Sequence, residues 1–103
     1  MPQGTLAMLV LRVLQSGTLH GYGIAQRIRQ LSDAVLEAEE GSLYPTLQRM
    51  LLEGWVSAEW GISETKRRVR FYQLTPAGKQ HLKRELAEYE QVSAAIRAIL
   101  RTA

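Results

Sequence analysis

The strongest constraint on this fold is a long helix that opens at Thr75-Pro76. Threonine is a favourable N-cap, and proline suits the first helical position because its missing N–H would have no partner there. No proline or glycine follows Gly78, so the sequence predicts one helix over residues 76–101. Residues 1–74 must therefore supply the body against which this helix packs.

The apolar residues of this predicted helix are spaced for pairing with another helix. Two rows repeat every seven residues, with leucines beside them: Leu82, Tyr89 and Ile96, then Val92 and Ile99, then Leu86 and Leu100. The pattern is that of a coiled-coil seam about three heptads long, interrupted by Glu85. A chain of 103 residues has little left to cover the distal half of the helix, so we expect it to pair with a second copy. Packing wholly within the monomer is the alternative.

A second apolar helix is predicted over residues 5–15. One face carries leucines and valines: Leu6, Leu9, Val10, Val13 and Leu14. Met8 and Leu11 make the opposite face apolar as well, and a helix of this kind is usually covered on two sides. The core accounts for one side, and we expect a second subunit to cover the other. The expected dimerisation residues are therefore Met8, Leu11, Leu82, Leu86, Tyr89, Val92, Ile96 and Ile99.

Two shorter amphipathic helices are predicted between these two. The first, residues 22–31, has apolar side chains that should point inward: Ile24, Ile28 and Leu31. The connector that follows, residues 32–40, is longer than the usual three- or four-residue turn of a helix-turn-helix. It suits a winged variant, in which a short extended stretch, here residues 35–38, precedes the third helix.

The third helix, predicted over residues 42–53, has one apolar and one polar side. Ser42 is the expected N-cap, which puts Pro45 at the third helical position, and Gly54 is the expected stop. The inward stripe consists of Leu43, Leu47, Met50 and Leu51. The outward side chains are mainly short polar groups and one arginine: Ser42, Tyr44, Thr46, Gln48 and Arg49. Such groups reach the phosphates and base edges of DNA, although an ordinary surface helix also looks like this.

The spacing of apolar residues no longer has a helical period after Gly54. Residues 55–60 and 69–74 are rich in β-branched and aromatic residues and are short enough for strands, so they predict a β-hairpin. Residues 61–70 would form a basic wing with these cations: Lys66, Arg67 and Arg68 at the tip and Arg70 at the base of the return strand. A flexible basic loop beside the third helix can contact a phosphate backbone or reach into a minor groove. A solvated run of charge is the alternative.

Several classes of function find no support in the sequence. The chain has no cysteine, which excludes disulfides, a thiolate nucleophile and a cysteine-based zinc site. His20 and His81 lie far apart, without a carboxylate or second histidine at metal-ligand spacing, so no metal or other cofactor is expected. The acidic residues Glu37, Glu39 and Glu40 suit the dipole of the third helix better than acid-base catalysis. We therefore expect no enzyme activity.

The charge and the N-terminal apolar run bear on partners and location. The formal net charge of +3 is small, but it matters because basic residues cluster between 66 and 70. The apolar run at residues 6–14 is interrupted by Arg12, lacks the features of a secretion signal and is too short to span a bilayer. The expectation is a soluble cytoplasmic protein.

Taken together, these motifs resemble one known family, the PadR family of bacterial winged-helix transcriptional regulators. The resemblance is carried by GTLAMLVLRVL, LHGYGIAQRI, EEGSLYPTLQRM, EGWV and RRVRFYQLTPAGKQHL, and it covers residues 3–100. It agrees with a mainly α fold with a small β-hairpin, in which a winged helix-turn-helix occupies residues 1–74 and a dimerisation helix occupies residues 75–103 of one compact unit. A single C-terminal helix is the short version, as in the smaller subgroup of the family.

Members of that family are homodimers that bind operator DNA and usually repress transcription. The resemblance therefore implies DNA contacts from the second helix, the third helix and the wing: Tyr22, Ser42, Tyr44, Thr46, Gln48, Arg49, Lys66, Arg67, Arg68 and Arg70. Many members have a Gly-Arg-Pro-Arg-like wing tip, where this chain reads Thr65-Lys66-Arg67-Arg68. This chain therefore keeps the positive charge of the tip but lacks the proline that makes the tip rigid.

The expected function is that of a homodimeric repressor, which reads a pseudo-palindromic operator through helix 42–53 and the wing. A winged-helix module that binds other proteins is the alternative, because a fold does not fix a function. A small aromatic or apolar effector is a further expected partner, at the dimer interface near Trp55, Trp60 and the inner face of helix 76–101.

Overall fold

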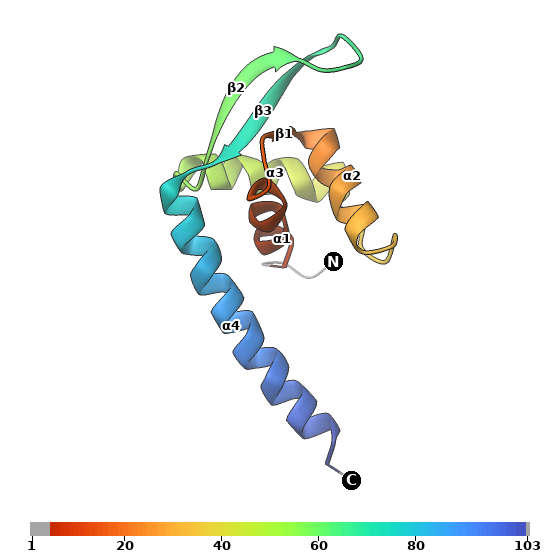
Figure 1. The fold of residues 1–103 in the computed structure, drawn as a ribbon, viewed down its shortest axis with the longest axis vertical. Helices are drawn as coiled ribbons and strands as arrows, with labels where there is room; N and C mark the ends of the chain where they lie inside the picture. Colours follow the sequence, from red (N-terminus) through yellow and green to blue (C-terminus); the bar gives the residue numbers. More distant parts are fainter. Residues whose placement is uncertain (1–4, 103) are drawn as a thin grey trace.

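The computed structural model of the chain describes residues 5–102 (Figure 1). In chain order its elements are α1 (Thr5–Leu14), β1 (Leu19–His20), α2 (Gly21–Leu31), α3 (Glu40–Leu52), β2 (Val56–Ile62), β3 (Arg68–Leu74) and α4 (Pro76–Leu100). The first three helices form the body, the β2–β3 hairpin projects from one end and α4 from the other, over extents of 56 × 29 × 22 Å. The predicted mainly α fold with a β-hairpin and a long C-terminal helix is confirmed. The two expected domains, residues 1–74 and 75–103, include residues 1–4 and 103, which lie outside the described part.

Strand β1 lies at residues 19–20, where the sequence predicted neither a helix nor a strand. The three strands form one antiparallel sheet in the order β1-β3-β2. Leu19 pairs with Tyr72 and His20 with Phe71, so β1 lies along the edge of β3 that β2 leaves open. A strand of two residues is too short to show the alternation of apolar and polar residues that identifies longer strands.

The connector between α2 and α3 contains no strand, so the extended stretch expected at residues 35–38 does not pair into the sheet. The chain turns sharply instead, with positive φ at Asp33 (49°) and Ala34 (65°). The Leu36 N–H donates to the Ser32 hydroxyl at 3.0 Å, which closes the turn. Leu31, predicted to point inward, is exposed because α2 ends there and the chain turns away.

Helix α1 is surrounded by its own chain, because it packs against α2, α3, α4 and β3. Met8 and Leu11 are both buried, and Leu11 has an exposed fraction of 0%. The expectation that a second subunit covers these two residues is therefore wrong, since the chain itself covers them. They belong to a mainly aliphatic core that also contains Leu6, Val10, Val13, Leu14, Ile24, Ile28, Leu43, Leu47, Met50, Val56, Tyr72, Leu74 and Leu82.

Helix α3 begins earlier than predicted. Its N-cap is Glu39, and the N–H groups of Ser42 and Leu43 both donate to the Glu39 carbonyl, at 3.0 and 2.8 Å. Ser42 therefore lies in the first turn, and Pro45 lies inside the helix instead of at its third position. Pro45 has no N–H to donate to the carbonyl of Gly41, four residues before it. Gly41 is exposed, so water can donate to this carbonyl instead. The predicted stop is confirmed, since Gly54 follows the helix with a φ of 77°.

The start of α4 agrees with the prediction. The Gly78 N–H donates to the Thr75 hydroxyl oxygen at 3.0 Å, which makes Thr75 the N-cap, and Pro76 is the first helical residue. The same hydroxyl donates to the Gly54 carbonyl at 2.6 Å. This pair of hydrogen bonds fixes α4 to the end of α3.

The apolar seam of α4 divides into a buried and an exposed part. Leu82 is 1% exposed within the body, so its assignment to a dimer contact is wrong, and Leu86 is partly buried against the same core. The later seam residues are at least half exposed: Tyr89, Val92, Ile96, Ile99 and Leu100. As predicted, nothing in the described residues covers the distal half of the helix.

Glu85, which interrupts the seam, has a partner in the same helix. Its Oε1 lies 3.0 Å from Nε2 of His81, and the His81 ring stacks on Trp55 at a centroid distance of 3.6 Å. The sequence analysis overlooked this carboxylate, which stands four residues after the histidine. Within residues 5–102, no three potential metal-ligating side chains lie together. No helix in that range is long and apolar enough to cross a membrane.

Gly78 lies directly against the Trp55 backbone, and this leads to a stability prediction. A Cβ at this position would overlap the Trp55 carbonyl oxygen and lie 2.9 Å from Leu74 Cδ1. We expect Gly78→Ala to lower the free energy of unfolding by about 3 kcal/mol, because α4 must shift away from the body. Thermal unfolding followed by circular dichroism measures the effect. Gly41→Ala is the control, since a Cβ there meets nothing within 4 Å; equal losses in both variants would contradict the packing argument.

Candidate nucleic-acid interface

The wing tip, residues 63–67, is a hydrogen-bonded turn and not the flexible loop that was expected. The Ser63 N–H donates to the Arg67 carbonyl at 2.9 Å, and the Lys66 N–H donates to the Ser63 carbonyl at 2.9 Å. The Ser63 hydroxyl accepts from the Arg67 N–H at 3.2 Å and lies 3.0 Å from the Thr65 hydroxyl. Ser63 is buried, whereas Lys66 and Arg67 are exposed. The turn thus presents its cations outward from a fixed base.

One face of the hairpin gathers arginine and aromatic side chains. Trp60 on β2 pairs with Arg70 on β3, and Arg68 lies two residues from Arg70, on the same face of the strand. The Cζ atoms of Arg68 and Arg70 lie 4.5 and 5.7 Å from the centroid of the Trp60 ring. Among the described residues, none of the wing cations Lys66, Arg67, Arg68 and Arg70 forms an ion pair with a carboxylate.

This face lines a cleft of about 780 Å³ between the wing, α3 and the start of α2. Its lining combines cations, aromatic rings and polar groups: His20, Gly21, Tyr22, Glu40, Tyr44, Gln48, Trp60, Ser63, Glu64, Thr65, Arg67, Arg68, Val69, Arg70 and Tyr72. Of the sequence-predicted DNA contacts, Tyr22, Tyr44, Gln48, Arg67, Arg68 and Arg70 come together here. The cleft therefore unites side chains from three separate stretches of sequence.

The polar residues of α3 fall into two groups. Glu40, Tyr44 and Gln48 are spaced by four residues and line the cleft. Ser42, Thr46 and Arg49 are not among its lining residues; Ser42 and Arg49 are exposed, and the Thr46 hydroxyl donates to the Ser42 carbonyl at 2.8 Å. Lys66 at the wing tip is likewise exposed outside the cleft lining.

Tyr44 connects α3 to the start of α2. A Cβ on Gly21 would lie 2.7 Å from the Tyr44 hydroxyl oxygen, so only glycine lets the ring approach this closely. Tyr72 lies on the opposite wall, and burial raises the pKa of its hydroxyl above the usual 10.0, while nearby Arg70 lowers it and Tyr44 raises it. Tyr72 is therefore neutral near pH 7, and its presence does not cancel the positive charge of Arg70.

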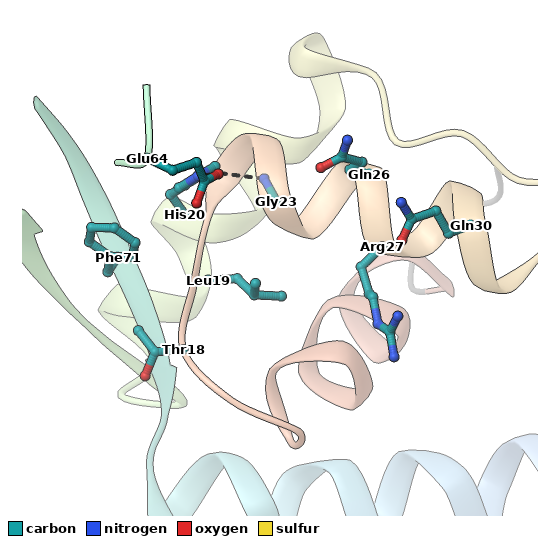
Figure 2. A pocket seen from close by; sticks show the side chains of 9 residues that line it. All are labelled: Thr18, Leu19, His20, Gly23, Gln26, Arg27, Gln30, Glu64 and Phe71. Atoms are coloured by element: carbon teal, nitrogen blue, oxygen red, sulfur yellow. Dashed lines mark hydrogen bonds and ion pairs between the residues drawn. The ribbon is translucent and has the colours of Figure 1, made fainter. Parts of the chain in front are cut away.

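A smaller hollow of about 280 Å³ lies beside β1 and α2 (Figure 2). It is lined by Thr18, Leu19, His20, Gly23, Gln26, Arg27, Gln30, Glu64 and Phe71. The Gly23 N–H donates to Nδ1 of His20 at 3.0 Å, so this histidine caps α2, and its Nε2 lies 3.8 Å from Oε1 of Glu64. His20 thereby links the wing tip to the first turn of α2.

Four residues of this region were not among the sequence-predicted DNA contacts: His20, Trp60, Glu64 and Tyr72. Two of them had a usable signal, because a hairpin closed at its basic tip places Trp60 opposite Arg70, and Tyr72 on the same face. His20 and Glu64 come from segments far apart in sequence, and no periodicity joins them.

Trp55 and Trp60, near which an effector was expected, lie in different parts of the fold. Trp55 stacks on His81 of α4, whereas Trp60 lies in the wing beneath Arg68 and Arg70. They are thus engaged by different elements.

A three-helix body, a polar third helix and a basic hairpin across one cleft define the winged-helix class of proteins. Comparison with known families gives a more specific assignment. The family model described as "Transcriptional regulator PadR-like family" matches residues 10–84. The chain belongs to the PadR-like family of transcriptional regulators, which is not a family of enzymes.

Individual relatives agree with this assignment. The negative transcriptional regulator PadR of Bacillus subtilis (strain 168) is 29% identical over 87 residues, which are 84% of this chain and 48% of that protein. A transcriptional regulator from Clostridium thermocellum superposes with a TM-score of 0.88 at 28% identity and 96% coverage of both chains. Bacillus subtilis PadR in complex with operator DNA gives a TM-score of 0.71 at 30% identity, covering 80% of this chain and 46% of that one. The chain thus spans about half the length of the Bacillus subtilis protein.

Proposed function

We propose that this chain is a DNA-binding transcriptional repressor that acts as a homodimer. The observation that carries the proposal is the cleft between α3 and the wing, where Arg67, Arg68 and Arg70 face polar side chains of α3. These cations have no carboxylate partner among residues 5–102, so their charge is free to attract phosphate. The similarity to the Bacillus subtilis PadR solved with operator DNA, and to the negative regulator of that name, supports operator binding and repression.

The proposed contacts divide by chemistry. Arg49 and the wing cations would bind phosphates and position the protein, because guanidinium and ammonium groups form charge-assisted hydrogen bonds to phosphate oxygens. Side chains of α3 would enter the major groove and contact phosphates or base edges: Ser42, Tyr44, Thr46 and Gln48. Tyr22, exposed at the start of α2, would contact the backbone beside them. The wing would lie on the flanking backbone or in the minor groove.

Dimerisation would use the exposed part of the seam on α4. Tyr89, Val92, Ile96 and Ile99 form an apolar face that the described chain leaves in contact with solvent. Pairing with the same face of a second copy would bury it and place the two α3 helices about a two-fold axis. Two related copies would read a pseudo-palindrome with half-sites about one helical turn apart. Such a regulator would work in the bacterial cytoplasm, where the chromosome lies.

A salt titration tests the proposal. The affinity for a fluorescently labelled duplex is measured by anisotropy at several salt concentrations. We expect the logarithm of the association constant to fall linearly with the logarithm of the salt concentration, with a slope of about −0.9 for each phosphate contacted. A protein-interaction module, the alternative for this fold, would bind duplex DNA weakly or not at all under the same conditions.

Gln48 is the side chain of α3 best placed to test base recognition, because it is exposed and lines the cleft. We expect Gln48→Ala to change the preference among operator variants by about 1 to 3 kcal/mol at one base pair, since glutamine can form paired hydrogen bonds with adenine. Competition binding with single-base variants of the operator measures the change. Gln91→Ala, on the exposed surface of α4, is the control. An unaltered ranking of the operator variants would exclude Gln48 from base recognition.

A further inference from the structure

Trp60 has an uncommon environment for a large apolar side chain. It is 60% exposed on β2, within the wing. It pairs directly with Arg70, and two guanidinium groups lie over its ring, that of Arg68 at 4.5 Å and that of Arg70 at 5.7 Å. A single indole thus holds two cations through cation–π contacts.

The way in which these arginines are held affects what they can bind. Within the described residues, neither has a carboxylate partner, and the buried Nε of Arg70 has no hydrogen-bond partner. A carboxylate would occupy the N–H groups and offset their charge. An aromatic ring contacts the face of the guanidinium and leaves the terminal N–H groups at its edge available; the buried Nε of Arg70 is not one of them. Trp60 therefore restricts both side chains without using the groups that bind an anion.

The geometry points to Trp60 as a positioning residue, which orders Arg68 and Arg70 for contact with phosphates and does not itself contact DNA. This inference rests on the proposed function as a DNA-binding protein. Long side chains lose rotamer freedom when they bind, so ordering them in the free protein strengthens binding. The number of phosphates contacted stays the same, because the same two arginines reach them. Trp60 should therefore change the affinity for DNA and leave its salt dependence unchanged.

A double-mutant cycle tests this role, with affinity measured by anisotropy on a duplex of mixed sequence over a range of salt. We expect Trp60→Leu to weaken binding about tenfold, since it removes two cation–π contacts. The slope against salt should stay constant, whereas Arg68→Ala with Arg70→Ala should reduce it by about two units. In the background that lacks both arginines, Trp60→Leu should have little further effect. Trp60→Tyr keeps an aromatic face and should restore most of the affinity.

Ile62→Ala is the matched control, because Ile62 is 65% exposed on the same face of β2 and pairs with Arg68. It should leave the affinity nearly unchanged, and an equal loss would attribute the effect to general packing and overturn the proposal. Circular dichroism verifies the fold of each variant, and Trp60→Thr, a residue favoured in strands, replaces Trp60→Leu if that variant unfolds. The same tenfold loss is expected of it.

Three other outcomes are decisive. Full affinity in Trp60→Leu would overturn the inference, and so would an undiminished effect of this change in the arginine-free background, because the indole would then contact DNA directly. If the unsubstituted protein shows no salt-dependent binding, the proposed function itself fails, together with this inference. The two failures are thus distinguished by the behaviour of the unsubstituted chain.

Discussion

Replacing Lys66, Arg67 and Arg68 together with alanine should weaken binding to every duplex sequence by about 100-fold or more near 0.1 M salt. Lys66 and Arg67 stand at the wing tip and Arg68 begins β3 beside it, and none of the three has a carboxylate partner in residues 5–102. Each phosphate contact that is lost should also reduce the slope of affinity against salt by about one unit. Because phosphates carry no sequence information, the ranking of operator variants should remain the same.

The matched control for that triple variant changes the net charge by the same amount elsewhere. Lys79, Lys83 and Arg84 are exposed on α4, outside the cleft. Their replacement by alanine should have only a small effect, since exposed charges more than a Debye length from the DNA are screened. If both triple variants lose the same affinity, the wing has no special role and only the total charge matters. Unchanged binding by the wing variant would remove the wing from the interface.

The second large effect is expected from Ile96→Asp combined with Ile99→Asp. Both side chains are more than half exposed in the single chain, and both belong to the proposed dimer contact. Burying two carboxylates in an apolar seam costs more free energy than the contact contributes, so the protein should become a monomer of 11.6 kDa. Binding to a two-half-site operator should fall by roughly 100-fold or more, because the second half-site loses its effective concentration. Analytical ultracentrifugation and anisotropy measure the two quantities.

The control places the same charges on exposed apolar residues away from α4. Leu31, the last residue of α2, and Val35, in the turn after it, are both exposed, and Leu31→Asp with Val35→Asp should leave the oligomeric state unchanged. A seam variant that remained a dimer would move the dimer contact to another surface. A variant that became a monomer and kept its operator affinity would contradict the link between pairing and recognition.

The parts of the fold that rest on neighbouring residues were accessible from the sequence. The capping by Thr75, the fixed φ of Pro76 and the positive φ of Gly54 act on backbone close to them in sequence, so these effects do not depend on distant partners. The apolar stripe of α3, with Leu43 and Leu47 buried, follows in the same way from helical spacing.

The parts that failed depend on contacts between distant segments. The apolar pattern of Met8 and Leu11 is compatible with either a core or a subunit interface. Only the packing of α4 and β3 against α1 shows that both residues belong to the core. Ser42 is a better N-cap by residue type than Glu39, but the helix extends one turn further back, where Glu39 and Glu40 meet the positive end of its dipole.

The candidate site shows the same division. The cations of the wing were evident as a charged cluster, and the polar side of α3 followed from its period. The pairing of Trp60 with Arg70 and the link from His20 to Glu64 required the register of the sheet and the packing of the wing against α2. The contacts of Trp60 and His20 were therefore not among the sequence-based predictions.

The central claim is that two copies of this chain recognise one operator through α3 and the wing. Selection of bound fragments from genomic DNA, with purified protein at a defined salt concentration near 0.15 M, tests it most directly. The proposed function predicts enrichment of a few fragments that share a pseudo-palindrome with half-sites about one helical turn apart. Recovery of fragments with no common sequence, at a level that the wing and seam variants also reach, would contradict it.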